Sequence, residues 1–179
     1  MNKQVAYQAL LKEISSLLAK IVWDGSNRLV PGEGNLSAKL VFVGEAPGAV
    51  EDELGRPFVG PAGQLLGKML ADLGWSRGEV YITNVVKFRP RENRDPTSEE
   101  IALFRPYLLR ELSLVKPLLV VILGRHALAA LLPDLKLSAV RGEIIRRGDF
   151  LYYVTYHPAA ALHNPNLQKV LLADFKKLP

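Results

Sequence analysis

The chain has 179 residues, of which 49% are hydrophobic and 23% are charged, and it carries a formal net charge of +5 at pH 7. This size and composition suit one globular domain with one core, and the basic balance weakly favours a polyanionic partner. The sequence contains no cysteine. That absence excludes disulfides, thiolate catalysis and Cys-ligated zinc or iron–sulfur clusters.

Hydropathy gives no sign of a membrane protein. No apolar run reaches the roughly 18 residues that are needed to cross a bilayer, and no segment resembles a signal peptide. We therefore expect a cytoplasmic protein with no membrane partner. We predict a single domain over residues 1–179, in which an N-terminal helix and turn, residues 1–27, pack on the rest.

Apolar periodicity predicts helices and strands that alternate along the chain. The first helix has Val5, Leu10, Ile14 and Leu17 among its apolar positions. Strands that alternate with helices indicate an α/β fold, a three-layer α/β/α sandwich around a short, mostly parallel sheet. The expected elements, in chain order, are a helix over 3–22, a loop over 31–35, a strand over 39–43, a helix over 62–73, a strand over 80–83, a loop over 87–96, a helix over 97–115, a strand over 117–123, a helix over 126–132, strands over 141–147 and 150–155, a loop over 157–165 and a helix over 166–177.

A polar loop follows the first strand. It contains Glu45 in the run GEAPG, then Glu51 within a group of three acids, and then the lone aromatic Phe58. Ligands bind at the carboxyl ends of strands in open α/β sheets, and a carboxylate with a ring nearby suits a flat polar ligand. The spacing alone is equally typical of an ordinary strand-to-helix turn with solvated acids.

Two more polar groups follow apolar runs, namely Asn84 and His157. With Glu45 they can converge at one edge of the sheet. An Asn amide both donates and accepts, which matches the edge of a pyrimidine, and a His can donate to an oxygen that gains negative charge. Taken singly, Asn84 is also explained as a turn cap and His157 as a structural histidine.

Two segments have the residues of phosphate contacts. The helix over 62–73 starts in a glycine-rich stretch, Gly60-Pro61-Ala62-Gly63, and such a start can receive a phosphate. The basic segment 87–96 offers cations to DNA phosphates. A plain helix start and a solvated loop are the alternatives. The cations of the basic segment are Lys87, Arg89, Arg91 and Arg94.

Four motifs together resemble the uracil-DNA glycosylase superfamily, and they are most similar to its family 4. They occur in that family's order and with similar spacings, and the resemblance extends over roughly 29–178. Each motif is short, and the combination in register is specific. The motifs are Gly44-Glu45-Ala46-Pro47-Gly48, Gly55-Arg56-Pro57-Phe58-Val59-Gly60, Tyr81-Ile82-Thr83-Asn84 and His157-Pro158-Ala159.

The resemblance implies a role for each matched residue. Glu45, Glu51 and His157 are implied as catalytic: Glu45 orients water or stabilises the sugar cation, and His157 stabilises charge on the departing base. Gly44, Ala46, Phe58 and Asn84 are implied to bind uracil, with the Phe58 ring stacked on the base. The residues implied to contact DNA are Gly60, Pro61, Ala62, Gly63, Lys87, Arg89, Arg91, Leu162 and His163, of which Leu162 is the candidate wedge.

The sequence departs from family 4 because that family typically holds an iron–sulfur cluster on four cysteines. By position, those cysteines correspond to sites at or near Leu17, Lys20, Phe88 and Leu103. We therefore expect no cofactor and no metal, and we hypothesise that a hydrophobic cluster joins the first helix to the segment 87–104. Relatives that cross-link covalently to DNA use a His after the Asn motif, and because 85–100 contains none, we expect no covalent adduct.

The leading hypothesis is a monofunctional uracil-DNA glycosylase for base excision repair, in which water is the nucleophile. Two alternatives stay open: an inactive relative that binds DNA or DNA damage, and a glycosylase for other deaminated bases such as hypoxanthine or xanthine. Lyase chemistry is not expected, because no motif places a lysine near the sugar, and Lys87 is the one lysine for which the question stays open. We expect a monomer, and the sequence leaves open whether a replication protein is a partner.

Overall fold

A six-stranded sheet forms the middle layer of the computed structural model, which describes residues 2–18 and 23–178. The strand order is β1-β3-β2-β4-β6-β5, in which the four inner strands are parallel and the two edge strands run antiparallel to their neighbours. The strands are β1 (Glu33–Gly34), β2 (Leu40–Gly44), β3 (Tyr81–Asn84), β4 (Leu119–Leu123), β5 (Ile144–Arg147) and β6 (Phe150–Thr155).

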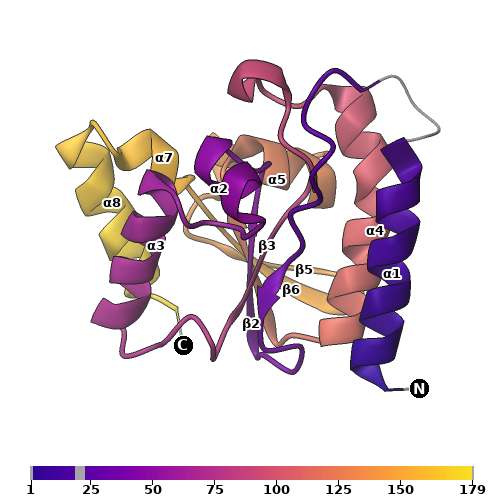
Figure 1. Ribbon diagram of the computed structural model, residues 1–179. Coiled ribbons are helices and arrows are strands. Elements are labelled where there is room, and N and C mark those ends of the chain that lie inside the picture. The colour runs from indigo at the N-terminus through magenta and orange to yellow at the C-terminus, as the bar shows by residue number, and fades with distance from the viewer. Residues whose placement is uncertain (1, 19–22, 179) are drawn as a thin grey trace.

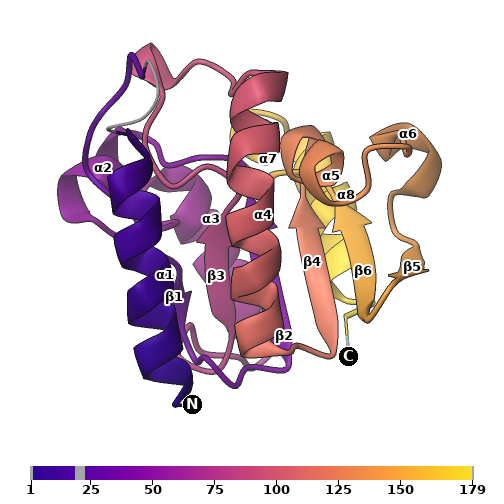
Figure 2. The same ribbon diagram turned by 90° about the vertical axis from the view of Figure 1, so that its right-hand side faces the viewer.

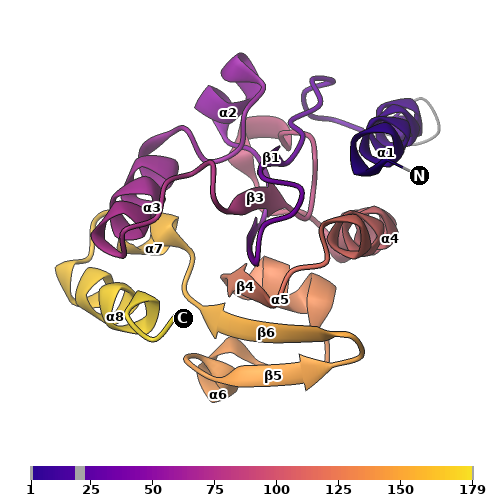
Figure 3. The same cartoon turned by 90° about the horizontal axis from the view of Figure 1, so that it is seen from below.

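Helices cover both faces of this sheet (Figures 1 and 3). On one face lie α1, α4 and α5, and on the other lie α3, α7 and α8. This arrangement confirms the predicted three-layer α/β/α fold. The helical elements are α1 (Lys3–Leu17), α2 (Ala49–Leu54), α3 (Pro61–Asp72), the 3-10 turn η2 (Arg91–Asn93), α4 (Ser98–Val115), α5 (Arg125–Leu131), α6 (Leu137–Val140), α7 (Pro158–Ala161) and α8 (Pro165–Phe175).

A separate hydrophobic cluster lies on each face of the sheet, between the strands and the helices that cover that face. Successive side chains of a strand point to opposite faces, so that Val41 and Val43 of β2 pack toward α1 and α4 while Phe42 packs toward α3 and α8. All three side chains are fully buried. The inner strands are buried on both faces, which explains why they read as continuous apolar runs rather than as alternating ones.

Helix α1 packs along α4, as Figure 2 shows. Its buried face contains Leu10, Ile14 and Leu17, as predicted, but the expected Val5 is 60% exposed. Tyr7 is buried in its place, and its hydroxyl donates to the carbonyl of Gly32. The predicted continuation of the helix to residue 22 falls on 19–22, which lie outside the described residues.

Four short elements depart from the predictions. The segment 33–34, within a predicted loop, is strand β1, the segment 49–54, expected as a polar loop, is helix α2, and the segments 91–93 and 137–140 form η2 and α6. None of the four contains a buried residue. Because apolar periodicity records a buried face, it cannot reveal elements of this kind. Within the described residues, no helix combines the length and apolarity needed to cross a membrane.

An aromatic group contains Phe88, one of the four positions at which the resemblance places a cysteine. The rings of Trp23, Phe88 and Phe104 pack edge to face or tilted, with centroids 6.0–6.3 Å apart. Phe88 and Phe104 are fully buried in the cluster that also contains Leu17, and Leu103 packs against it. Lys20 lies outside the described residues. Aromatic packing thus connects the N-terminal segment to Phe88 and to α4.

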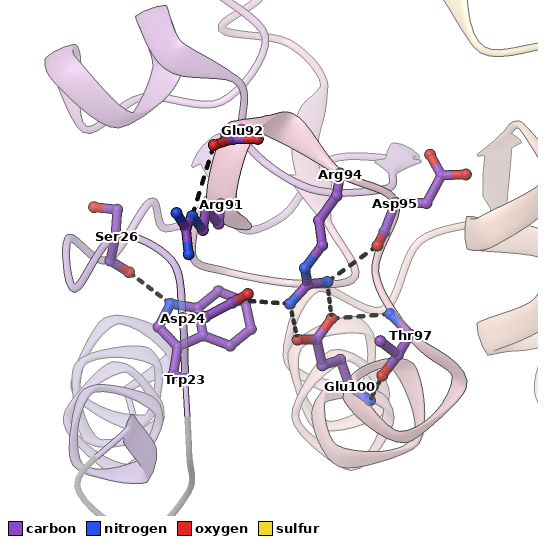
Figure 4. Close-up of polar contacts among 9 residues, drawn as sticks. All are labelled: Trp23, Asp24, Ser26, Arg91, Glu92, Arg94, Asp95, Thr97 and Glu100. Carbon is purple, nitrogen blue, oxygen red and sulfur yellow. Dashed lines mark hydrogen bonds and ion pairs between the residues drawn. The ribbon is translucent and has the colours of Figure 1, made fainter.

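Polar contacts of Arg94 join the segment that contains Asp24 to the start of α4 (Figure 4). Arg94 donates two hydrogen bonds to the carboxylate of Glu100, at 2.6 and 2.9 Å, and a third to Asp24 at 2.7 Å. Glu100 also accepts from the backbone of Thr97, which completes the predicted capping box of α4. The expectation that Arg94 is available for phosphates is therefore corrected, because two carboxylates of its own chain hold its guanidinium.

We expect Phe88→Ala to lower the free energy of unfolding by about 3–5 kcal/mol, since it removes a fully buried ring and leaves a cavity. Val5→Ala, at an exposed site of α1, is the control and should change the free energy by less than about 0.5 kcal/mol. Urea unfolding of the two variants measures both values. A loss below about 1 kcal/mol for Phe88→Ala would show that the aromatic group does not hold the segments together.

Candidate active site

A pocket of about 490 Å³ opens at the carboxyl ends of the parallel strands. Glu45 follows β2, Asn84 ends β3, and His157 follows β6, so three separate segments supply its polar groups. Phe58 reaches the same pocket from the loop before α3. The structure therefore brings together the four side chains that the sequence singled out. The other lining residues are Ala46, Pro47, Gly48, Ala49, Val50, Glu51, Pro61, Ala62, Pro90, Asn93, Arg94, Asp95, Ala159 and Leu162.

Asn84 presents an unsatisfied acceptor to this pocket. The residue is 3% exposed, and its buried side-chain Oδ1 has no hydrogen-bond partner among residues 2–18 and 23–178. A buried polar atom with no partner costs free energy unless something else pairs with it. Gly44 lies opposite Asn84 in the β2–β3 pairing, and a Cβ on Gly44 would come within 2.5 Å of Oδ1. Glycine at position 44 thus leaves room for the Asn84 amide at the end of the strand.

Phe58 is held in a strained backbone conformation. Its φ of 52° lies in the left-handed region, which bulky residues seldom adopt. Arg77 donates to the carbonyl of Phe58 at 2.8 Å and to that of Pro57 at 2.7 Å. No signal in the sequence pointed to Arg77, because it lies in the loop after α3. Strain that surrounding contacts maintain is typical of a functional site.

The ring of Phe58 lies 5.4 Å from the ring of His157, with an angle of 30° between the planes. The Nδ1 atom of His157 accepts a hydrogen bond from the backbone N–H of Ala159. A neutral imidazole carries one proton, so the proton of His157 is on Nε2. Burial lowers the pKa of His157 to about 4, with the nearby Glu51 opposing that shift. The imidazole is therefore neutral at pH 7 and has one N–H to donate.

Glu51 lines the pocket but already has backbone partners. Its Oε1 accepts from the N–H of Val59 at 2.9 Å and from that of Gly60 at 2.7 Å. These bonds fix the loop that carries Phe58 into α3. Glu51 is thus a residue that positions the pocket wall, and its catalytic role stays a prediction.

Glu45 lies in a charged group that the sequence analysis did not find. Burial and the neighbouring Asp95 raise the pKa of Glu45, whereas His126 and Arg125 act in the opposite direction. The Nε2 atom of His126 lies 3.7 Å from Glu45 and 3.3 Å from Asp95. His126 is the second residue of α5, which begins directly after Gly124 at the end of β4. This place next to a strand end was the one signal in the sequence that could have pointed to His126.

Glu45, Asp95 and His126 have ligand atoms within 4.8 Å of one another, as in a metal site. Arg125, however, donates to Nε2 of His126 at 2.9 Å and to Asp95 at 2.5 Å. Nε2 of His126 and one oxygen of Asp95 are thus already paired with Arg125. The guanidinium of Arg125 therefore supplies the positive charge of this group, and the arrangement does not fit a resident metal.

The residues expected to contact DNA have different environments. Arg91, Leu162 and His163 are exposed, and Leu162 lies on the pocket wall. Arg89 is partly buried and donates to Asn93. In the glycine-rich helix start, Pro61 is exposed and Ala62 partly so, but Gly60 and Gly63 are buried. The N–H of Gly60 is occupied by Glu51, so this helix start offers fewer free donors than expected.

The predicted role of Lys87 as a DNA contact is wrong. Lys87 was expected to contact DNA phosphate, but its side chain is 1% exposed. Its ammonium pairs with Glu111 of α4 at 2.5 Å, beneath the sheet edge rather than on the surface. Composition shows that the segment 87–96 is basic, but it does not show that the Lys87 side chain is buried against Glu111.

Comparison with known proteins identifies the family. The family model described as the uracil DNA glycosylase superfamily matches residues 31–177. The chain therefore belongs to the uracil-DNA glycosylase superfamily.

Within that superfamily, the type-4 enzymes are similar to this chain. It is 43% identical to the type-4 uracil-DNA glycosylase of Sulfurisphaera tokodaii, over 96% of this chain and 82% of the relative. It is 45% identical to that of Archaeoglobus fulgidus, over 94% and 89%. A type-5 uracil-DNA glycosylase of Pyrobaculum aerophilum is 34% identical, over 87% and 75%. The resemblance inferred from the four motifs is confirmed.

The low pKa of His157 predicts a pH dependence of stability. Between its ordinary value of 6.5 and about 4, the unfolded chain binds a proton that the folded chain does not bind. The free energy of unfolding therefore falls as the pH falls through this window. We expect the free energy of unfolding of His157→Gln to fall by about 3 kcal/mol less than that of the parent between pH 7 and pH 4, as measured by urea unfolding. The exposed His163→Gln serves as control and should follow the parent. Equal losses for parent and His157→Gln would contradict the assignment.

Proposed function

We propose that this protein is a uracil-DNA glycosylase, a DNA-repair hydrolase that removes uracil from DNA and leaves an abasic site. The observation that carries the proposal is the buried, unpartnered Oδ1 of Asn84 in a pocket that Phe58 and His157 also line. Family membership and the similarity to type-4 enzymes support the same activity. The substrate is DNA that contains uracil.

The polar edge of uracil suits Asn84. Uracil presents the N3–H donor beside the O4 acceptor, so the orphan Oδ1 can accept from N3–H while the amide nitrogen donates to O4. Cytosine presents an acceptor at N3 and a donor at N4, which is the reverse order. The ring of Phe58 offers a flat apolar surface on which the base stacks. A base must leave the duplex to reach this pocket, at a cost of a few kcal/mol.

His157 and Glu45 have complementary roles in the chemistry. As the C1′–N1 bond breaks, its electron pair leaves with the base, and the neutral imidazole donates its Nε2–H to an oxygen of the uracil anion. The Glu45 carboxylate stabilises the positive sugar and orients the water that adds to C1′. The proton that this water loses balances the one that the uracil anion takes up, so that the products are the abasic sugar and neutral uracil. Both interactions are stronger in the transition state than in the ground state, which is the condition for catalysis.

The finer features of the proposal concern DNA and turnover. Arg91 and His163 contact phosphates, and Leu162, which is 37% exposed on the pocket wall, fills the gap left by the flipped base. The enzyme acts as a monomer through water. The burial and pairing of Lys87 argue against a lyase step through that amine, because a buried ammonium is no nucleophile.

An oligonucleotide with one labelled uracil site tests the activity. We expect alkali-dependent strand cleavage at the uracil, together with release of free uracil, opposite G or A or in a single strand. Cleavage without alkali would indicate a lyase. A mobility shift without uracil release would indicate a DNA-binding relative, and release from hypoxanthine or xanthine sites alone would indicate a different base specificity.

His157→Asn separates the chemical role of the ring from its structural role. Asn keeps an acceptor for the N–H of Ala159, as N-cap residues do, but it removes the Nε2–H donor. We expect the single-turnover cleavage rate to fall by about 10²–10³, the loss typical of one oxyanion donor, with unchanged affinity for uracil-containing DNA. Val5→Asn, at an exposed site of α1 outside the pocket, should keep the parent rate. A parent-like rate for His157→Asn would remove His157 from the chemistry.

A further inference from the structure

The buried Lys87 contacts the backbone of Asn84, the residue that faces the base in the proposed function. The ammonium of Lys87 contacts three acceptors, namely Thr83 Oγ1, the backbone carbonyl of Asn84 at 2.7 Å and Glu111 Oε2 at 2.5 Å. An ammonium has three protons, so every donor of Lys87 has a partner. One of these bonds is made to the backbone of Asn84 itself, at the end of β3.

Glu111 extends this contact into the core. It is 1% exposed, and its Oε1 accepts from the hydroxyl of Tyr81 at 2.6 Å and from Thr83 at 3.1 Å. Tyr81 packs edge to face on Tyr7 of α1, with ring centroids 6.2 Å apart. The network thus ties the end of β3 to α4 and to α1. Burial lowers the pKa of Lys87, and Glu111 opposes that shift.

Stability alone does not account for such a pair. Two charges lose their hydration when they are buried, and apolar replacements of similar volume are often neutral or stabilising. The pair also has a geometric effect. Glu111 of α4 holds the Lys87 ammonium in place, and this ammonium binds the backbone carbonyl of Asn84. The carbonyl of Asn84 is fixed at the point where the chain leaves the sheet, and fixing it sets the direction of the Asn84 side chain.

We propose that Lys87 is a positioning residue for base recognition: its ammonium, held by Glu111, fixes the backbone at Asn84 so that the side-chain amide faces the base. The inference rests on the proposed function, in which Asn84 reads uracil. Lys87 does not touch the substrate. It acts through Asn84, and its effect on cleavage is expected only while the Asn84 amide is present.

The test removes the charges as a pair. The double variant Lys87→Met/Glu111→Gln leaves no unpaired buried charge, and the new amide on α4 retains an acceptor for Tyr81. We expect this double variant to unfold at a urea midpoint near that of the parent, whereas kcat/KM on uracil-containing DNA falls about 10- to 100-fold, the range for losing a well-placed amide contact to a base. Added to Asn84→Ala, the same pair should cause little further loss, because its effect passes through the amide.

The matched control is Arg110→Met, which breaks an exposed ion pair between α4 and Glu13 of α1. It should leave kcat/KM unchanged. If the stable double variant kept the parent value of kcat/KM, the pair would be structural only and the proposal would be overturned. A full additional loss in the Asn84→Ala background would overturn it as well.

A spectroscopic readout separates this inference from the proposed function. The side-chain amide signals of Asn84 in a ¹H–¹⁵N spectrum are identified by their absence in Asn84→Ala. We expect them to shift or broaden in the double variant and to stay in place in Arg110→Met. Unmoved signals would overturn the positioning role whether or not the parent cleaves uracil. A parent that releases no uracil would instead defeat the proposed function, and shifted signals would still support the positioning of Asn84.

Discussion

The parallel pairing of β2 with β3 is the constraint on which the pocket depends. The register sets Gly44 opposite Asn84 at the point where both strands end. A side chain at position 44 would collide with the Phe58 ring at 2.4 Å and with Asn84 Oδ1 at 2.5 Å. A glycine in this one place lets a ring and an amide approach the same strand end. Since a shift by one residue turns every side chain to the other face, this register also keeps Asn84 at the pocket.

Buried polar networks hold the ends of two strands, β3 and β6, that lead into the pocket. Under β3, Lys87 and Glu111 hold the chain at Asn84. Under β6, Asp174 of α8 accepts from the hydroxyl of Thr155 at 2.7 Å and pairs with Arg141. Thr155 lies two residues before His157. In both cases a helix that covers the sheet supplies a carboxylate to the strand end that carries a pocket residue. The two helical layers therefore do more than bury apolar surface, because they also anchor the ends of the strands.

The described N-terminal segment is joined to the pocket without cysteine. Trp23, Phe88 and Phe104 pack together. Arg94 binds the carboxylate of Asp24, which follows Trp23, and that of Glu100 in α4. Arg94 and the next residue, Asp95, both line the pocket. The segment 88–95 therefore connects the aromatic group, through Phe88, to the wall of the pocket, through Arg94 and Asp95. Aromatic contacts and ion pairs hold this part of the described chain together.

The sequence by itself determined the layers, the four inner strands and the four main pocket residues, since long apolar runs and short motifs both depend on local order along the chain. Only the tertiary structure decided the environment of each group. It buried Lys87, occupied Arg94, gave Glu51 backbone partners and added His126 and Asp95 beside Glu45. These outcomes depend on residues far apart in the chain, such as Lys87 and Glu111. Composition reveals that a charge is present, but only the packing of distant elements decides whether it faces water or a partner.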